Sequence, residues 1–390
     1  MALQGDSIAQ AVADSRFPAF VAYLPQTPWY GGGGFWCRAL SGNGGFINQA
    51  ISGDQAGYYL PNAHHFRRQT FTSMVKYVVI EYGVNDLGGA LISAAQLQTY
   101  LIQLALQNLR RGVSKVFIQT LTPESTCTSG TWQTVAEQTP LSFVTGTRAT
   151  HNAWVRGGCQ INPTTLAPVT SGGITAGSDG HPIAGWFDVA AQVESGGSSS
   201  PAGVWIAPKS VVTDGSCTNG TYSVTSTNAA FNATNVGDNI TVVGAGAASS
   251  VTGCSSSGTT LTLGTATPIV NGSTVSITSG TGTFVAGTVV SKGGGASISG
   301  VSSVTTVTLS QAPTVALSGA TVQFIAPFTS QIIKLTSSTT VATTDAPSQT
   351  IASGATVIVG QPTLDGIHPC TTINAQLGAY LKTQLSAFTG

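Results

Sequence analysis

Two short motifs, one near each end of the sequence, carry side chains suited to nucleophilic catalysis. Gly5-Asp6-Ser7 offers a hydroxyl directly after a short strand candidate, and Asp365-Gly366-Ile367-His368 offers an imidazole with a carboxylate three residues before it. A histidine accepts the proton of a serine hydroxyl effectively when an acceptor fixes its other ring nitrogen. The motifs therefore predict a nucleophile and its base, although Asp and Ser are also common helix caps and either motif alone means little.

Two further motifs could supply hydrogen-bond donors to the same reaction. Ile51-Ser52-Gly53-Asp54 and Gly83-Val84-Asn85-Asp86 each follow a predicted strand. A glycine lets its backbone N–H approach a substrate oxygen closely, and the Asn85 side chain adds an N–H donor. Together with the N–H of Ser7, these groups would form an oxyanion hole. Taken singly, Gly and Asn are also the residues that ordinary turns require.

The elements that must position these motifs are strands of a parallel sheet. Segments 46–51, 77–82 and 116–121 are nearly continuous apolar runs, which is typical of strands buried on both faces. In an open α/β sheet the turns that follow parallel strands meet at one edge, where ligands bind. We therefore expect Ser7, Gly53 and Asn85 to lie at that edge.

Helical segments separate the predicted strands. The clearest is predicted over 93–111, because Ser93 and Gln96 can form a capping box, leucines repeat along one face and Gly112 ends the helix. Further helices are expected at 8–24 and 371–388. The alternating order predicts an α/β fold with a mainly parallel sheet.

Residues 206–360 differ from the rest of the chain in composition. They contain no Arg, Glu, His or Trp, and a Gly/Ser-rich stretch at 196–201 precedes them as a linker. Short polar–apolar alternations such as 260–263 and 274–277 predict an all-β sandwich, barrel or solenoid. Disorder is the alternative for so polar a segment. The resulting division is 1–205, 206–360 as a β-rich insert, and 361–390.

In this order, the four motifs resemble the signature blocks of the SGNH (GDSL) hydrolases. The resemblance covers 1–205 and 361–390, and it implies a flavodoxin-like three-layer α/β/α domain interrupted by the all-β insert. It implies Ser7 as the nucleophile, His368 as general base and acid, and Asp365 as the group that orients His368. It also implies that Ser7, Gly53 and Asn85 form the oxyanion hole. The sequence departs from the family in its minimal first strand, with polar Gln4 before the motif, and in the long insert.

Three softer matches to the family lie between the main motifs. They are Leu121-Thr122-Pro123 after the predicted strand at 116–121, Asn152 and Arg156 on a helix, and a late strand at 186–189. The insert itself resembles β modules of bacteriophage tail spikes and of secreted polysaccharide-active enzymes.

A second histidine competes for the role of base. Asp179-Gly180-His181-Pro182 looks much like the motif around His368, but its Asp lies only two residues before the His. That spacing gives the carboxylate less chain with which to turn back to the imidazole. We therefore expect His368, and not His181, to act.

Aromatic residues around Gly31–Gly34 form the candidate substrate-binding group. Trp29, Tyr30 and Trp36 could stack on a sugar or an acyl group, or could instead anchor a long loop to the core.

The charge balance excludes several classes of partner. The 390 residues include 14 Lys+Arg against 14 Asp+Glu, and only 7% are charged. There is no clustered positive charge for nucleic acid or anionic lipid, and no apolar run reaches the ~18 residues of a membrane span. Five histidines without an H-E-x-x-H motif predict no metal site. The expected partner is an acylated carbohydrate or another small ester, with no cofactor; the oligomeric state stays open.

These observations predict an enzyme, an SGNH-type carboxylic ester hydrolase acting on O-acyl, and specifically O-acetyl, esters of a carbohydrate. A carbohydrate is favoured because the sequence lacks a long apolar lid for a lipid and because the insert offers an uncharged Ser/Thr/Asn surface. One alternative is a short-chain acyl esterase or lipase. Another is a non-catalytic surface or phage-tail binding protein with an esterase-like fold.

Six cysteines in a chain poor in charge favour disulfides. They also favour an extracytoplasmic, secreted or virion-associated protein, although no signal peptide is visible at Met1. Domain boundaries suggest the pairs Cys217–Cys254, Cys127–Cys159 and Cys37–Cys370, among many possible connectivities.

Overall fold

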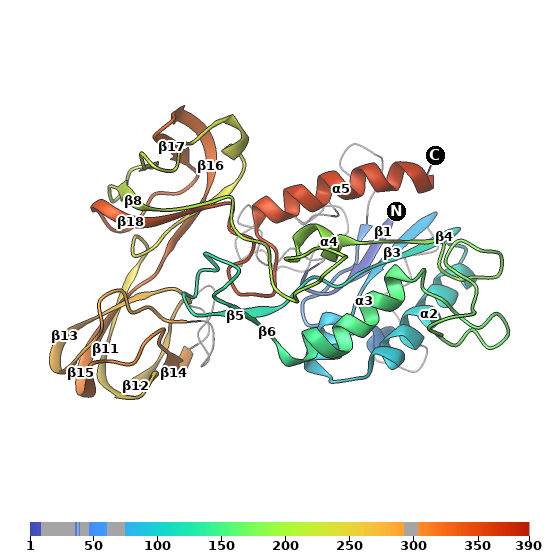
Figure 1. Ribbon diagram of the computed structural model, residues 1–390, viewed down its shortest axis with the longest axis horizontal. Coiled ribbons are helices and arrows are strands. Elements are labelled where there is room, and N and C mark those ends of the chain that lie inside the picture. Colours follow the sequence, from blue (N-terminus) through green and yellow to red (C-terminus); the bar gives the residue numbers. More distant parts are fainter. Residues whose placement is uncertain (9–35, 37–38, 40–46, 61–74, 292–302, 390) are drawn as a thin grey trace. The chain divides into compact units, whose positions relative to one another are not determined.

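The computed structural model describes residues 1–8, 36, 39, 47–60, 75–291 and 303–389 (Figure 1). The chain divides into two compact units, and each is described by itself. The α/β unit comprises Met1–Glu124, Pro140–Val204 and Ile373–Gly390, and the β unit comprises Ser125–Thr139 and Trp205–Thr372. The three-part division expected from sequence stays a prediction.

The α/β unit contains a five-stranded parallel sheet in the order β2-β1-β3-β4-β7. Its strands are β1 (Ala2–Gly5), β2 (Ile47–Asn48), β3 (Tyr77–Glu81), β4 (Lys115–Gln119) and β7 (Gly185–Phe187). Four of the five residues of β3 and of β4 are buried, as expected for strands covered on both faces. The short first strand lies between β2 and β3, in the interior of the sheet.

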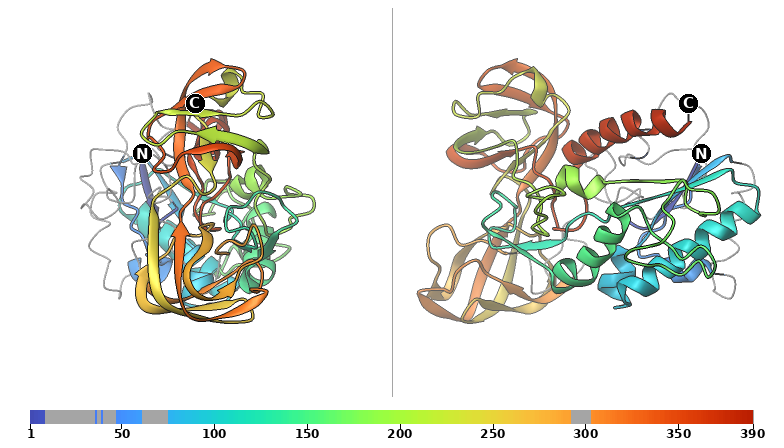
Figure 2. Two further views of the ribbon diagram at one scale, coloured as in Figure 1. Left: turned by 90° about the vertical axis from the view of Figure 1, so that its left-hand side faces the viewer. Right: turned by 45° about the vertical axis from the view of Figure 1, so that its right-hand side comes forward.

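Helices cover both faces of this sheet, with α5 (Thr371–Thr389) on one face and α2 (Ala94–Arg110) and α3 (Ala149–Arg156) on the other (Figures 1 and 2). The predicted cap of α2 is present, because Ser93 Oγ accepts the Gln96 N–H at 3.2 Å. A short helix α4 (Val189–Val193) begins directly after β7. The predicted three-layer α/β/α arrangement is confirmed. Nearly all of the helix expected at 8–24 lies outside the described residues.

The β unit contains a closed six-stranded barrel in the order β10-β16-β17-β9-β8-β18. Its strands are β8 (Ser210–Cys217), β9 (Ser223–Thr225), β10 (Asn239–Val242), β16 (Phe328–Ser337), β17 (Thr340–Thr343) and β18 (Ile351–Val359). Val224, Ile240, Ile332 and Val357 are among the fully buried side chains of its core.

A second, antiparallel sheet of the β unit has the order β13-β15-β11-β12-β14. Its strands are β11 (Ala248–Ser257), β12 (Thr260–Pro268), β13 (Thr274–Thr283), β14 (Ser303–Thr308) and β15 (Val315–Ile325). Leu261 and Leu263 are buried while Thr260 and Thr262 are exposed, so the predicted alternation is confirmed. The unit also holds β5 (Ser125–Cys127), which pairs with β6 (Gln138–Pro140). The all-β insert is thus confirmed, and disorder is excluded for its described residues.

Two of the three predicted disulfides, Cys217–Cys254 and Cys127–Cys159, are wrong. Cys127, Cys159, Cys217 and Cys254 are free and buried. Cys217 belongs to the core of the barrel and Cys254 to the core of the second sheet, so the two pack in different apolar clusters. Burial raises the pKa of the Cys127 thiol to about 12, which leaves it protonated at neutral pH. Cys37 lies outside the described residues.

Two classes of feature are not found in the described part of the chain. Its His, Cys, Asp and Glu side chains form no group that could hold a metal ion. Its helices include none long and apolar enough to cross a membrane.

Candidate active site

Ser7 stands two residues beyond the end of β1, at the carboxyl edge of the parallel sheet. The turn that carries it is closed by Asp6, whose Oδ1 accepts the Ile8 N–H at 2.9 Å. Both side chains are largely enclosed, Asp6 fully and Ser7 with 6% of its surface exposed. The predicted nucleophile therefore lies in a fixed turn at the edge where such sheets bind ligands.

The turn that carries Gly53 is attached to the same strand. After β2 the chain continues along β1, with the Gln49 N–H donating to Leu3 O at 2.8 Å and the Ile51 N–H to Gly5 O at 3.0 Å. Gly53 has a φ of +83°, and no atom lies within 4 Å of the position a Cβ would take. Backbone conformation, and not crowding, thus favours glycine there.

Asn85 and Asp86 tie the turn after β3 to the turn after β2. Asn85 Nδ2 donates to Asp54 O at 3.2 Å, and the Asp86 carboxylate accepts the Ala56 N–H at 3.0 and 3.1 Å. Burial raises the pKa of Asp86 to about 6, against the hydrogen bonds from Ala56 and Gly57 that lower it. An amide nitrogen carries two hydrogens, so Asn85 can bond Asp54 and still donate to a substrate oxygen.

The Asp365–His368 pair forms as the spacing predicted. His368 Nδ1 lies 2.5 Å from Asp365 Oδ2, while Asp365 Oδ1 accepts the N–H groups of His368 at 2.8 Å and Ile367 at 3.0 Å. Burial would raise the pKa of Asp365, but the charge and hydrogen bonds of His368 outweigh it and hold the pKa well below its usual range. Asp365 is therefore ionised and fixes Nδ1 of the imidazole as the protonated nitrogen.

Gly366, between the two residues of the pair, lies against the rest of the β unit. Its φ is +83°, and a Cβ would lie 1.8 Å from Ser125 O and 2.7 Å from Trp132 Cζ2. Gly366 O accepts two hydrogen bonds, from the Ser125 N–H at 3.0 Å and from Trp205 Nε1 at 2.9 Å. Close packing at its Cα and two hydrogen bonds to its carbonyl oxygen thus fix the turn that carries Asp365 and His368.

Gln138 connects these supporting groups. Its Oε1 accepts from Ser125 Oγ at 2.9 Å and from the Trp205 N–H at 3.0 Å, and its Nε2 donates to Trp205 O at 3.1 Å. Trp132 Nε1 donates to Ser125 Oγ at 3.0 Å. Sequence reasoning missed this set, which we call the Gly366 support (Ser125, Trp132, Gln138 and Trp205). Its only signal in the sequence is Trp205, the last tryptophan before the charge-poor segment.

The predicted catalytic residues thus form two groups. Ser7, Gly53 and Asn85 belong to the α/β unit and lie at the ends of adjacent strands, while Asp365 and His368 belong to the β unit and form a hydrogen-bonded pair.

Comparisons with known proteins found similar solved structures for part of the chain. TesA is 25% identical, with a TM-score of 0.22, over 31% of this chain and 59% of that one. Axe2, an acetylxylan esterase from Geobacillus stearothermophilus, is 17% identical, with a TM-score of 0.23, over 31% of this chain and 59% of that one. LAE5, an alpha/beta hydrolase enzyme from the metagenome of Lake Arreo in Spain, is 17% identical, with a TM-score of 0.24, over 31% and 60%.

Each of these likenesses covers about a third of the chain. The match spans about three fifths of the length of those proteins. No protein-family model and no curated protein sequence matches the chain.

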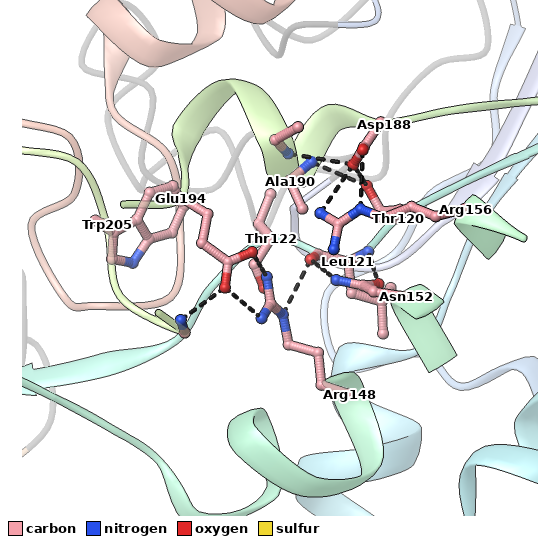
Figure 3. Close-up of polar contacts among 12 residues, drawn as sticks. Thr120, Leu121, Thr122, Arg148, Asn152, Arg156, Asp188, Ala190, Glu194 and Trp205 are labelled. Atoms are coloured by element: carbon pink, nitrogen blue, oxygen red, sulfur yellow. Dashed lines mark hydrogen bonds and ion pairs between the residues drawn. The ribbon is translucent and has the colours of Figure 1, made fainter. Parts of the chain in front are cut away.

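The softer sequence matches lie together in a buried polar network after β4 (Figure 3). Asn152 bonds both backbone groups of Leu121, at 2.8 and 2.9 Å, and Arg148 Nε donates to Leu121 O and Thr122 O at 3.0 and 2.7 Å. Arg148 also forms a buried ion pair with Glu194, with contacts of 3.1 and 2.9 Å. Buried side chains therefore fix the backbone of the segment after β4.

A second ion pair anchors the start of α4. Arg156 contacts both carboxylate oxygens of Asp188, at 2.9 and 3.1 Å, and Asp188 Oδ1 accepts from Thr120 Oγ1 at 3.0 Å (Figure 3). The late strand predicted at 186–189 is shorter than expected. It ends at Phe187, because the next residue, Asp188, caps α4.

His181, the competing histidine, has backbone partners for both ring nitrogens. Nε2 lies 2.9 Å from Cys159 O, and Nδ1 lies 3.1 Å from Ile183 O and accepts the Ile183 N–H at 3.0 Å. Burial lowers its pKa, although these contacts oppose the shift. Such contacts suit a structural histidine that supports the loop before β7.

Trp36 is the one predicted substrate-binding aromatic within the described residues. It is 1% exposed, its Nε1 donates to Gln119 Oε1 at 2.9 Å, and its ring meets Phe187 edge-on at 5.3 Å between centroids. These contacts fit the alternative interpretation of Trp36, in which the side chain packs in the core and does not bind substrate. Trp29 and Tyr30 lie outside the described residues.

Proposed function

We propose that this chain is a serine esterase of the SGNH type. The observation that carries the proposal is the bond between His368 Nδ1 and the buried, ionised Asp365. This bond leaves Nε2 as the imidazole nitrogen that can accept a proton. A paired imidazole of this kind is what activates a serine hydroxyl, and Ser7 stands in the sequence motif that resembles the family's nucleophile.

The proposed reaction has two halves. Ser7 Oγ attacks the ester carbonyl while His368 Nε2 takes the hydroxyl proton, and the resulting oxyanion accepts from the Ser7 N–H, the Gly53 N–H and Asn85 Nδ2. Collapse of the tetrahedral intermediate expels the alcohol, which takes the proton from His368. Water then attacks the acyl-enzyme while His368 Nε2 takes its proton. The second tetrahedral intermediate releases the acid as that proton passes to Ser7 Oγ.

The proposed substrate is an O-acetyl ester of a carbohydrate. The β unit supports this choice, because residues 206–360 carry only Lys209, Asp214, Asp238, Lys292, Lys334 and Asp345 as formal charges. A surface of hydroxyl, amide and backbone groups can exchange its water for sugar hydroxyls without burying an unpaired charge. Among the solved structures similar to part of the chain, Axe2 is an acetylxylan esterase.

The experiment is hydrolysis of p-nitrophenyl acetate, p-nitrophenyl octanoate and acetylated xylan by the wild-type chain and by Ser7→Ala. We expect the acetate ester to be turned over faster than the octanoate, and acetyl groups to be released from the polymer. Ser7→Ala should lose about 10³-fold or more in kcat while its Tm stays unchanged. Ser199→Ala, which truncates an exposed serine of the same unit, is the matched control.

Each comparison tests a different part of the proposal. Wild-type turnover by Ser7→Ala would remove Ser7 from the mechanism. Faster turnover of the octanoate would favour the lipase alternative. Turnover of p-nitrophenyl acetate without release of acetyl groups from the xylan would favour the short-chain esterase. A wild-type chain that hydrolyses none of the three substrates would overturn the proposal.

A further inference from the structure

The β unit contains a pocket that the esterase mechanism does not use. Its volume is about 660 Å³, within the range of sites that hold small molecules. Three parts of the unit form its wall: the loop between β5 and β6, the β18 end of the barrel, and segments of the second sheet. Exposed Gln311 and Ser353 belong to this wall, so solvent reaches it.

The chemistry of the wall is uniform. Among the described lining residues none is charged and none is aromatic, and more than half carry a hydroxyl or an amide. Examples are Ser353 and Thr356 on β18 of the barrel and Gln311 between β14 and β15 of the second sheet. A phosphate or carboxylate ligand would find no counter-charge here, and a lipid chain would face polar groups that lose their water. A neutral ligand with many hydroxyl groups can donate hydrogen bonds to the oxygens of this wall and accept them from its hydroxyl and amide groups.

One side of the pocket is preformed. In the loop after β5, Ser129 Oγ accepts from Thr131 at 3.2 and 3.3 Å, and Gln133 Nε2 donates to Thr131 Oγ1 at 2.8 Å. Gly130 of this loop is so close to the second sheet that a Cβ would lie 2.3 Å from Val290 O and 2.4 Å from Gly272 N. The loop therefore has little freedom, and a ligand would lose little affinity to ordering it.

We propose that this pocket binds a neutral oligosaccharide. The proposal rests on the proposed function in one respect, since it assigns the pocket to the sugar part of the esterase substrate. Thr128, Ser129 and Gln133 of the loop after β5 would contact the sugar on one side. Ser353 of β18 and Gln311 of the second sheet's side of the wall would contact it from the other two. The loop that carries Ser129 also carries Trp132, which belongs to the Gly366 support, so a single loop is part of both the sugar site and the support of the Asp365–His368 turn.

The test is isothermal titration calorimetry of the Ser7→Ala chain with xylohexaose, cellohexaose and maltohexaose. The three probes are unacylated, and they differ only in their neutral sugars and linkages. We expect at least one of them to bind. Ser353→Trp, which places an indole in the pocket, should weaken that binding at least tenfold, and Gln311→Ala should weaken it severalfold.

A matched control is Thr336→Trp on β16, an exposed position of the barrel outside the pocket lining. It should bind as the parent chain does. Equal weakening by Ser353→Trp and Thr336→Trp, or no effect of either pocket variant, would overturn the assignment of the pocket. Failure of all three hexasaccharides to bind would also overturn it.

The two proposals fail separately. Hydrolysis of p-nitrophenyl acetate by the wild-type chain together with no hexasaccharide binding would sink the sugar pocket and leave the esterase intact. Binding that Ser353→Trp abolishes, together with no hydrolysis of any ester, would sink the esterase and leave a sugar-binding pocket.

Discussion

His368 Nδ1 lies 2.5 Å from Asp365 Oδ2, and the same carboxylate accepts the backbone N–H of His368 through its other oxygen. One side chain thus fixes both the ring and the backbone of the histidine. In contrast, His181 contacts only backbone groups through its ring.

This difference predicts unequal effects of removing the two histidines. His368→Ala should lower kcat for p-nitrophenyl acetate by a factor comparable to that of Ser7→Ala, because members of one catalytic unit are strongly non-additive. His181→Ala should cost at most a few fold in kcat, together with some stability. Steady-state kinetics on both variants check this, and a crippled His181→Ala beside an active His368→Ala would reverse the assignment.

The Gly366 support predicts a positioning role for Trp205. Trp205→Phe keeps most of the buried ring but removes the N–H that donates to Gly366 O. One net hydrogen bond is worth about 1 kcal/mol, so kcat should fall by up to about tenfold as the Asp365–His368 turn loosens. KM for the small acetate ester should stay unchanged.

Trp154→Phe is the matched control for this change. Trp154 Nε1 donates to Gln160 O at 2.9 Å, a bond of the same kind in the α/β unit, and its loss should leave kcat unaltered. Equal kcat losses in the two variants would show that Trp205 acts through general stability alone.

Asn85→Ala should lower kcat by about 10²-fold to 10³-fold, as the loss of one oxyanion donor does elsewhere. It also removes the bond to Asp54 O, so thermal unfolding should be followed beside the kinetics. Asn228→Ala, at an exposed position of the β unit, is the matched control. Undiminished kcat in Asn85→Ala would remove this side chain from the oxyanion hole.

Asp86 predicts a pH dependence of stability. Its pKa is raised from 3.8 to about 6 in the folded protein, so the folded state binds this proton more tightly than the unfolded state does. Protonation then favours folding, and the free energy of unfolding should fall as the pH rises from about 4 to about 6, by up to about 3 kcal/mol from this group.

Asp86→Asn should abolish this contribution, because the amide does not ionise while its oxygen can still accept the Ala56 N–H. Urea unfolding of the two proteins across that pH range measures it. The wild type should lose stability relative to Asp86→Asn as the pH rises, and parallel curves would contradict the shifted pKa.

The buried cysteines predict free thiols in the native protein. The denatured, unreduced protein should titrate with at least four free thiols, those of Cys127, Cys159, Cys217 and Cys254. Fewer than four thiols would show that a disulfide forms among these four cysteines.

The sequence was informative where a residue's role depends on local structure. Gly53 and Asn85 follow strands whose apolar runs are evident, so the edge they share could be predicted before any coordinates. Ser7 follows a minimal strand and was placed at that edge by its motif. The Asp365–His368 contact closes within four residues, and its spacing alone indicated it.

Contacts between residues far apart in the sequence could not be predicted in this way. Trp205 meets Gly366 across 161 positions, and Gln138 meets Trp205 across 67, with no periodic pattern at either end. The disulfide prediction failed for the same reason, because an even number of cysteines says nothing about which apolar core each one joins.

The place of α5 in the chain has a consequence for biosynthesis. Phe388 near its end packs against Phe117 and Phe187 of the sheet, at 5.3 and 5.8 Å between ring centroids, yet residues 205–370 are translated between β7 and α5. At ribosomal rates of about 5–20 residues per second, the part of the nascent sheet that α5 covers waits on the order of ten seconds or more for this helix. Slower translation of that segment should therefore increase aggregation of the nascent chain and its dependence on chaperones.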